Sequence, residues 1–260
     1  MSRTSQYPWR LFFLLLVAGV LGVAAIIPYL LALSADTIQK IPLPIPLPIL
    51  IAVQFVQNVI LLSVAVGIGL LASRKLGLGA PFLEAWLYKQ AKVVPWRMLA
   101  ISAIAGVGTS VFIVIIANLV FRPLLGQLPP LAQLVLPLWK RFLACLYGAL
   151  DEEILMRLFL LSGLLWLIAR FWRNLQGRTT SSTFWITNVL VAILFGLGHM
   201  PAASLIMPIN MATTLYIISL NGIGGLVFGY LFWRCGLESA MVAHFFADIV
   251  LGVIGPVFVR

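Results

Sequence analysis

The chain has 260 residues, of which 62% are hydrophobic and 9% are charged, and its formal net charge is +10 at pH 7. Soluble globular domains carry roughly 25% charged residues, so this composition excludes a soluble enzyme and predicts an all-α, multi-pass integral membrane protein. The basic residues flank apolar runs, which is typical of membrane topology signals and argues against nucleic acid as a partner. The two cysteines, Cys145 and Cys235, lie in apolar surroundings and predict neither a disulfide framework nor a metal site.

Apolar runs of about 20 residues can cross a bilayer as helices, and the sequence predicts a transmembrane helical bundle of about seven such spans. The first run is longer than the apolar core of a signal peptide (about 7–15 residues), so we predict an uncleaved span, although residues 32–34 resemble a cleavage site. A helix break is predicted near residues 199–201, because Pro201 ends helices. Gly225 and Gly229 form a pair of small residues one turn apart, which predicts close approach of another helix. The predicted spans are residues 11–33, 49–73, 98–121 and 142–169, two spans within residues 179–233, and residues 239–259.

The connections between the predicted spans carry local signals. A short loop with Asp36 and Lys40 follows the first span, and alternating prolines over residues 42–48 predict an extended segment there. Residues 122–141 are proline-rich and form a connection that could partly re-enter the membrane. Residues 74–97 show a short helical period, which predicts an amphipathic helix at the membrane interface. In this helix Leu83, Trp86, Leu87 and Ala91 form the apolar face, and Glu84, Lys89 and Lys92 lie off it.

The Lys and Arg residues are divided unequally between the two sides of the predicted bundle. Eleven lie on the side of the N-terminus, five lie on the other side, and Arg157 lies within a span. Because positive residues are enriched in cytoplasmic loops, we predict a cytoplasmic N-terminus in the cell (plasma or inner) membrane. The sequence shows no internal repeat, and we divide it into N-terminal spans with the interfacial helix (1–137) and a four-helix catalytic core (138–260).

Three consecutive acidic residues, Asp151, Glu152 and Glu153, and the nearby Arg157 interrupt the predicted span 142–169. Ionisable side chains are costly in hydrocarbon, so this stretch is a candidate functional site. Glu153 and Arg157 are four residues apart and are expected to pair along one helix face, whereas Glu152 is turned about 100° away. We therefore expect Glu153 to be fixed as an ion and Glu152 to be free to exchange protons. The alternative is a structural ion pair that locks two helices together.

The two histidines of the chain, His199 and His244, lie in separate apolar spans. Counted from one membrane side, both histidines and Glu152 lie roughly 15–27 Å deep at about 1.5 Å per residue, so we expect them to meet in one polar pocket. Phe195 precedes His199 by one turn and could form a wall of that pocket. Asp248 follows His244 by one turn and could hydrogen-bond a ring nitrogen and fix its tautomer. The alternatives are a core or lipid-facing Phe195 and a purely structural hydrogen bond from Asp248.

Together, three motifs on separate spans resemble those of the CPBP intramembrane proteases. This family includes the type II CAAX prenyl endopeptidases and the bacteriocin-processing enzymes of the Abi family, and the resemblance covers about residues 140–255. It implies an intramembrane endopeptidase that hydrolyses a peptide bond by a glutamate-dependent mechanism and requires no cofactor. The motifs are Glu152-Glu153-x-x-x-Arg157, Phe195-x-x-x-His199 and His244-x-x-x-Asp248.

The resemblance also implies roles for individual residues. Glu152 would be the general base that activates water, with His199 assisting it. Glu153 and Arg157 would orient Glu152. A glutamate base works best when burial raises its pKa toward the working pH. A carboxylate within the membrane fits this requirement.

The remaining pair, His244 and Asp248, would stabilise the oxyanion of the tetrahedral intermediate, which is often the largest catalytic term. Here the sequence departs from the prenyl endopeptidases, which usually carry Asn where this chain has Asp248. An ionised aspartate cannot donate a hydrogen bond to an oxyanion. We therefore expect Asp248 to orient His244 and keep it protonated.

Two alternatives to the metal-independent protease follow from the same residues. The first is a metal-dependent membrane hydrolase that uses a divalent metal such as zinc, although the compact H-E-x-x-H motif is absent. The second is a non-enzymatic proton-coupled transporter or membrane partner protein, because Glu and His chains also form proton relays. The predicted partners are membrane lipid and a protein or peptide substrate, with or without a lipid attached. The metal ligands would be Glu152, His199, His244 and Asp248.

Overall fold

The structure is a computed structural model that describes residues 7–40, 45–89, 96–126, 136–171 and 180–255. In these ranges the chain forms helices and no strand, which confirms the all-α prediction. Among the described residues, six helical segments are long and apolar enough to cross a membrane. They are Trp9–Leu33, Leu47–Leu76, Trp96–Leu125, Ser181–Ala203, Met211–Cys235 and Leu237–Ile254.

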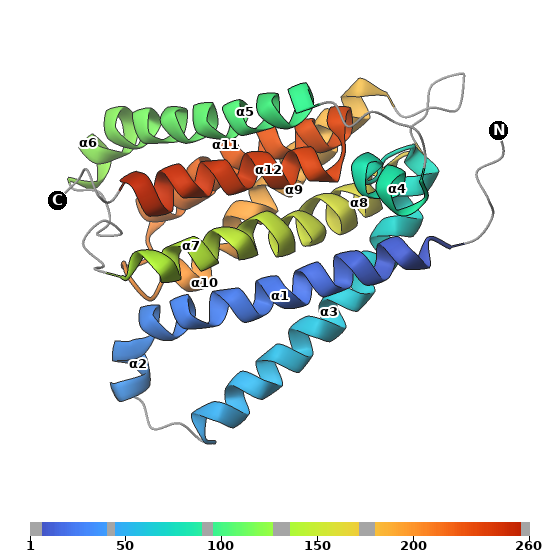
Figure 1. Cartoon of the computed structure of the whole chain (residues 1–260). Coiled ribbons are helices and arrows are strands. Elements are labelled where there is room, and N and C mark those ends of the chain that lie inside the picture. Colours follow the sequence, from blue (N-terminus) through green and yellow to red (C-terminus); the bar gives the residue numbers. More distant parts are fainter. Residues whose placement is uncertain (1–6, 41–44, 90–95, 127–135, 172–179, 256–260) are drawn as a thin grey trace.

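A seventh helical segment lies between the third and fourth of these and carries the acidic motif. It runs without interruption over residues 138–168, and its central part, residues 148–161, is π-helical except at Glu153. With this segment the bundle matches the prediction of about seven spans, and Figure 1 shows its helices running roughly side by side. The segment consists of α7 (Leu138–Tyr147), the π-helices η3 (Gly148–Glu152) and η4 (Ile154–Leu161), and α8 (Ser162–Ile168).

The other elements follow the predicted order, with small differences at their ends. The elements are α1 (Trp9–Leu33), α2 (Ala35–Lys40), α3 (Leu47–Leu76), α4 (Pro81–Leu87), α5 (Trp96–Ile116), η1 (Ala117–Phe121), α6 (Arg122–Leu125), α9 (Ser181–Gly198), α10 (Met200–Ala203), α11 (Met211–Cys235), α12 (Leu237–Asp248) and η5 (Ile249–Ile254).

Two predicted connections were partly wrong. Residues 35–40, predicted as a loop, form the short helix α2. The extended proline segment ends earlier than predicted, because Pro48 lies in the first turn of α3, where its missing N–H leaves no helical hydrogen bond unmade. Residues 41–44 lie outside the described residues. The predicted break at residues 199–201 is confirmed, since α9 ends at Gly198 and α10 begins at Met200.

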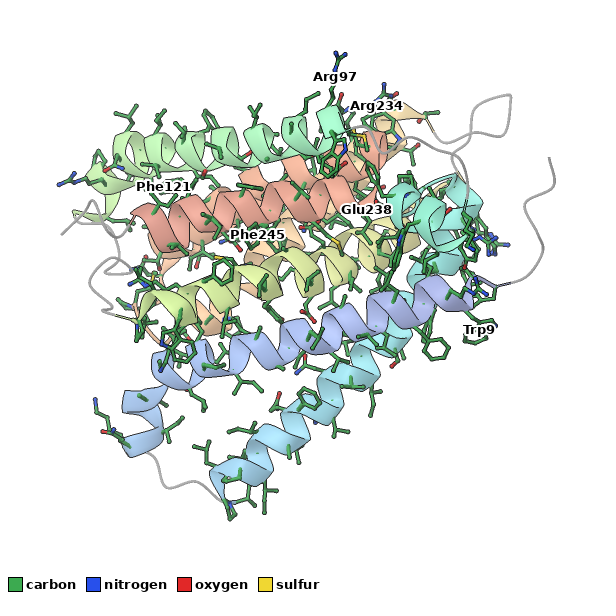
Figure 2. The ribbon with its side chains drawn as sticks, in the orientation of Figure 1. Trp9, Arg97, Phe121, Arg234, Glu238 and Phe245 are labelled. Atoms are coloured by element: carbon green, nitrogen blue, oxygen red, sulfur yellow. The ribbon has the colours of Figure 1, made fainter. Side chains whose placement is uncertain are left out.

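Side chains that the predicted topology assigns to opposite membrane sides lie at opposite ends of the bundle. Trp9, Arg97 and Arg234 lie toward one end of the bundle, and Phe121 lies at the opposite end (Figure 2). Exposed aromatic side chains extend from the first of these ends: Trp86 is 70% exposed and Trp96 is 78% exposed. Such aromatic side chains are typical of a membrane–water interface. The chain is therefore a multi-pass integral membrane protein, and the cytoplasmic side of its N-terminus stays a prediction.

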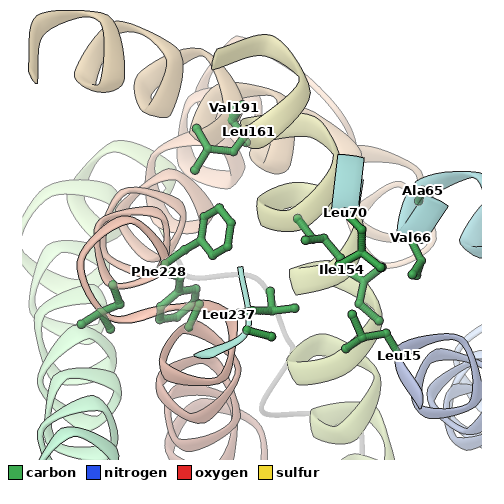
Figure 3. Packing of buried hydrophobic residues seen from close by; sticks show 14 of the residues in the cluster. Leu15, Ala65, Val66, Leu70, Ile154, Leu161, Val191, Phe228 and Leu237 are labelled. Atoms are coloured by element: carbon green, nitrogen blue, oxygen red, sulfur yellow. The ribbon is translucent and has the colours of Figure 1, made fainter. Parts of the chain in front are cut away.

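The apolar core joins the N-terminal helices to the helices that carry the motifs. Leu15 from α1 and Leu70 from α3 pack with Ile154 and Leu161 of η4 and with Phe228 of α11 in one cluster (Figure 3). Helices from both sides of residue 137 therefore share one core. The division into residues 1–137 and 138–260 stays a prediction about sequence organisation.

The predicted interfacial helix exists as α4, but its apolar residues do not share one environment. Leu83 and Leu87 pack against the core, whereas Trp86 is exposed. Glu238 of α12 explains this placement, because its Oε1 accepts hydrogen bonds from the backbone N–H groups of Phe82 (2.9 Å) and Leu83 (2.8 Å). The carboxylate thus satisfies the free N–H groups of the first turn of α4 and ties this helix to α12. Ala91 and Lys92 lie outside the described residues.

Close approach between α9 and α11 depends on the small-residue pair Gly225 and Gly229. A Cβ atom on Gly225 would lie 3.0 Å from the Cα of Ala192, and one on Gly229 would overlap the side-chain amide of Asn188. Both partners belong to α9. The predicted role of this pair in helix packing is therefore confirmed.

Helix α5 approaches α12 at Gly106, and this contact yields a test. A Cβ atom on Gly106 would overlap the backbone carbonyl oxygen of Ala243, the residue before His244. We expect Gly106→Ala to destabilise the fold by about 1–3 kcal/mol, because a backbone contact cannot yield as a side chain can. Gly108→Ala on the same helix is the matched control, since a Cβ there meets no atom within 4 Å. Thermal unfolding in detergent measures both variants, and equal melting temperatures for the two would contradict the contact.

Candidate active site

Three helical segments bring the candidate residues together near the middle of the bundle. Glu152 and Glu153 lie at the junction of η3 and η4, His199 caps the C-terminus of α9, and His244 lies in the middle of α12. Two of these segments are π-helical at the site, since η3 and η4 flank Glu153 and η5 begins directly after Asp248. π-Helical turns occur often at functional sites, because the extra residue in the turn changes the direction of the side chains.

Glu153 links the acidic motif to α12. Its Oε1 accepts a hydrogen bond from Nδ1 of His244 at 2.7 Å and lies 2.9 Å from Nη1 of Arg157. All three side chains are buried, with Glu153 0% exposed. A carboxylate can only accept, so Nδ1 of His244 carries the hydrogen. The Nε2 atom of His244 is therefore the ring atom that faces the other motif residues.

The guanidinium of Arg157 lies next to Glu153, between two aromatic rings that form a cage around it. Its guanidinium carbon lies 4.9 Å from the ring centre of Phe195 and 5.4 Å from that of Phe228. The Nη2 atom donates to the backbone oxygen of Gly225 at 3.4 Å, which is a long contact. The 2.9 Å approach of Nη1 to Glu153 is a charge–charge contact without hydrogen-bond alignment. Attraction between the positive guanidinium and the faces of the two aromatic rings compensates part of the free-energy cost of burying Arg157.

Glu152 lies between the two imidazole rings and remains accessible. Its Oε1 lies 3.9 Å from Nε2 of His199, and its Oε2 lies 3.6 Å from Nε2 of His244. The side chain of Glu152 is 21% exposed and that of His199 is 33% exposed, whereas that of His244 is 6% exposed. The structure thus brings together the three residues whose matched depth predicted a common site. Separations of 3.6–3.9 Å exceed a direct hydrogen bond and fit groups that share one water or substrate atom.

His199 is held so that one ring nitrogen faces Glu152. Its Nδ1 lies 2.8 Å from the backbone oxygen of Phe195, and a carbonyl oxygen can only accept, so Nδ1 donates and Nε2 is the free acceptor. The ring of Phe195 stands edge-on to both histidines, with ring centres 4.8 Å from His199 and 5.8 Å from His244. Phe195 therefore contacts both imidazoles, as predicted for a pocket wall.

Two expected orienting contacts were wrong in detail. Asp248 Oδ2 lies 3.6 Å from Nε2 of His244, which is too long for the hydrogen bond that was expected to fix the tautomer. Glu153 makes that bond instead, at Nδ1, because it approaches the buried side of the ring. Glu153 therefore orients His244 directly, and Arg157 lies next to the same carboxylate. Among the described residues, no contact supports the expectation that Glu153 and Arg157 orient Glu152.

Sequence reasoning missed two residues that shape the site. The ring of Phe228 stacks on His244 with ring centres 4.6 Å apart, and only its position beside Gly225 and Gly229 could have indicated it. A Cβ atom on Gly148 would overlap Oδ2 of Asp248 and lie 3.2 Å from Nε2 of His244. Gly148 precedes Glu152 by four residues, so the helical period could have placed it on the same face.

Asp151, the remaining ionisable residue of the acidic stretch, does not join the cluster formed by Glu152, Glu153 and the two histidines. It is 1% exposed and faces α1, where a Cβ atom on Gly22 would overlap its Oδ2. Both carboxylate oxygens lack a hydrogen-bond partner among the described residues. Gly22 thus leaves room for a side chain that points away from Glu152.

The four candidate zinc ligands do not form a recognisable metal-binding group among the described residues. Within the described ranges, no three His, Cys, Asp or Glu side chains form a group that could hold a metal ion. The Nδ1 atoms of His199 and His244 are hydrogen-bonded to Phe195 and Glu153, so the Nε2 atoms are the ring nitrogens that would be available to a metal. Metal dependence stays a prediction that a chelator can test.

Comparison with known proteins adds one finding to this geometry. No curated protein and no solved structure matches the chain. Residues 134–250 match the family model described as type II CAAX prenyl endopeptidase Rce1-like. The matched segment contains Glu152, Glu153, Arg157, both histidines and Asp248, and it includes all the side chains that meet at the site. Through this segment, which is somewhat less than half of the chain, the protein is similar to the Rce1-like type II CAAX prenyl endopeptidases.

Proposed function

We propose that the protein is an intramembrane endopeptidase in which Glu152 activates water to hydrolyse a peptide bond. The observation that carries the proposal is the position of Glu152, an accessible carboxylate whose two oxygens face the Nε2 atoms of His199 and His244. The family match supports a peptidase over the transporter that the sequence alone also allowed. Embedding such a site in the membrane suits a substrate that is itself held at the bilayer, such as a lipid-linked peptide.

The proposed reaction assigns each proton to a group at the site. Glu152 takes a proton from water as the water oxygen attacks the scissile carbonyl, and Nε2 of His199 accepts a hydrogen bond from the same water. In its protonated form, His244 holds Nδ1–H on Glu153 and donates Nε2–H to the oxyanion. Glu152 then passes its proton to the nitrogen of the leaving amine as the C–N bond breaks, so that a carboxylic acid and an amine are released and the carboxylate of Glu152 is restored. The product acid loses its remaining proton to the amine or to solvent.

Asp248 acts in this proposal through its charge. Its Oδ2 lies 3.6 Å from Nε2 of His244, close enough to favour the imidazolium form without binding the nitrogen that must donate. This role is compatible with an aspartate where the prenyl endopeptidases usually carry asparagine. It also assigns the donor at the oxyanion to His244 alone.

The test uses purified protein in liposomes with three fluorogenic peptides of one sequence ending in a CAAX motif. One peptide carries a farnesyl group, one carries a palmitoyl group and one carries no lipid. We expect both lipid-linked peptides to be cleaved faster than the peptide without lipid, because the lipid concentrates them at the membrane. The family match favours the farnesylated peptide over the palmitoylated one. We expect 1,10-phenanthroline to leave the rate unchanged. Loss of activity with the chelator, restored by zinc, would replace the glutamate mechanism with the metal-dependent one. A failure to cleave any of the peptides, or any protein in membranes that are compared at their peptide termini, would contradict the peptidase.

A further inference from the structure

The first half of α3 lies apart from the bundle. The buried residues of α3 begin at Leu62, and none of residues 47–61 is buried. Figure 1 shows this half diverging from the other helices, with α1 between α3 and α7. Helix α1 contacts both of these neighbours. A membrane-spanning helix half without a packed neighbour is either lipid-facing or an interface for another chain.

One face of this half has the pattern of a helix-packing surface. Phe55 packs against the core, and the centre of this face is turned away from Phe55 by about a third of a turn around the helix axis. It carries a shallow hollow that is widely open to its surroundings. The side chains on it are mostly β-branched or small and follow the i, i+3, i+4, i+7 spacing that helices use against each other. The hollow is lined by Pro48, Ile49, Ala52, Val53, Val56 and Gln57.

Gln57 is the polar residue on this face, and lipid cannot satisfy it. It lies ten residues into α3, which is about 15 Å along the helix and therefore within hydrocarbon. Its side chain is exposed and makes no hydrogen bond in the described part of the chain. The neighbouring Asn58 shows the contrast, because its amide donates to the backbone oxygen of Gln54 at 2.8 Å. Amide side chains within membranes are typically satisfied by a neighbouring helix.

We propose that this face of α3, defined by Ile49, Ala52, Val53, Val56 and Gln57, binds the same face of a second copy of the protein. A glutamine amide offers both a donor and an acceptor, so it is complementary to itself. In a two-fold dimer with its axis along the membrane normal, Gln57 meets Gln57 at the same depth. The small side chains Ala52 and Val53 let the two helices approach closely around this pair.

The position of the face argues against a substrate helix as its occupant. α1 lies between this half of α3 and the segment that carries Glu152, and α1 packs directly on η3. A helix seated on the hollow would therefore have α1 between its backbone and Glu152. Self-association through α3 leaves the accessible side of Glu152 free.

The dimer can be tested by oxidative cross-linking in liposomes. In a Cys145→Ala/Cys235→Ala background, Val56→Cys is expected to form a covalent dimer. Ile104→Cys on α5 is the control, because Ile104 is 70% exposed on a helix outside the proposed interface. Equal yields for the two cysteines at low protein-to-lipid ratio, or a product of Val56→Cys with a different protein in cell membranes, would overturn the proposal.

A second measurement keeps the native cysteines and follows energy transfer between labelled copies in liposomes. We expect Gln57→Leu to weaken self-association by about three- to tenfold, as measured for interhelical hydrogen bonds in membranes. Asn118→Leu is the matched control, since Asn118 is an exposed amide on η1 whose Nδ2 donates to its own helix at 2.9 Å. A wild-type protein that stays monomeric at every protein-to-lipid ratio, or a dimer that Gln57→Leu leaves unchanged, would contradict the interface.

Discussion

Replacing Glu152 with glutamine is expected to abolish peptide cleavage and to leave the stability of the fold unchanged. Glutamine keeps the size and shape of the side chain but cannot take a proton from water, and loss of a general base typically lowers the rate by about 10²- to 10⁴-fold. The side chain is partly exposed, and its oxygens stand 3.6 Å or more from both histidine nitrogens. The carboxylate of Glu152 therefore contributes little to the free energy of unfolding.

The measurement compares kcat/KM on the peptide that the wild type cleaves fastest, together with thermal unfolding in the same detergent. Glu84→Gln is the matched control, because Glu84 lies on α4, outside the site. This control should retain full activity. A Glu152→Gln protein that cleaves at the wild-type rate would transfer the role of base to another residue, and His199 would be the first to examine.

Much of this arrangement can be predicted from the sequence, because the membrane imposes strong constraints. Apolar runs of span length identify the helices, and proline at residue 201 identifies the break after His199. Charges inside a span must face protein, so the acidic motif and the two histidines had to point inward. Their matched depths along separate helices then place Glu152, His199 and His244 in one layer. The pair of Glu153 with Arg157 follows from the helical period alone.

The contacts of each side chain within that layer could not be predicted, because they depend on how far each helix is rotated about its axis. The π-helical turns in η3 and η4 change that rotation, and no residue pattern in the segment announces them. The hydrogen bond from His244 to Glu153 joins residues 91 positions apart, and it replaces the local contact with Asp248 that spacing favoured. The stacking of Phe228 on His244 likewise depends on the packing of α11, to which its own sequence neighbours give little clue.

Substituting glutamine for Glu152 or for Glu153 is expected to have very different effects on the stability of the fold. Glu153 is fully buried, holds Nδ1 of His244 at 2.7 Å and lies 2.9 Å from Arg157. Glu153→Gln removes the charge that compensates the buried guanidinium, and removing one partner of a buried ion pair typically costs about 3–5 kcal/mol. We therefore expect Glu153→Gln to unfold at a much lower temperature than Glu152→Gln.

The double variant Glu153→Gln/Arg157→Met separates this charge effect from the role of Glu153 at the site. Methionine fills the aromatic cage between Phe195 and Phe228 without a charge, so the double variant should regain most of the stability that Glu153→Gln loses, because no uncompensated ion remains buried. It should nevertheless stay inactive, since His244 still lacks the carboxylate that holds its Nδ1–H and favours the imidazolium form. Thermal unfolding and peptide cleavage of the wild type, both single variants and the double variant measure the two effects on one set of proteins. Equal melting temperatures for Glu152→Gln and Glu153→Gln would show that the buried pair does not stabilise the fold, and an active double variant would show that His244 does not depend on Glu153.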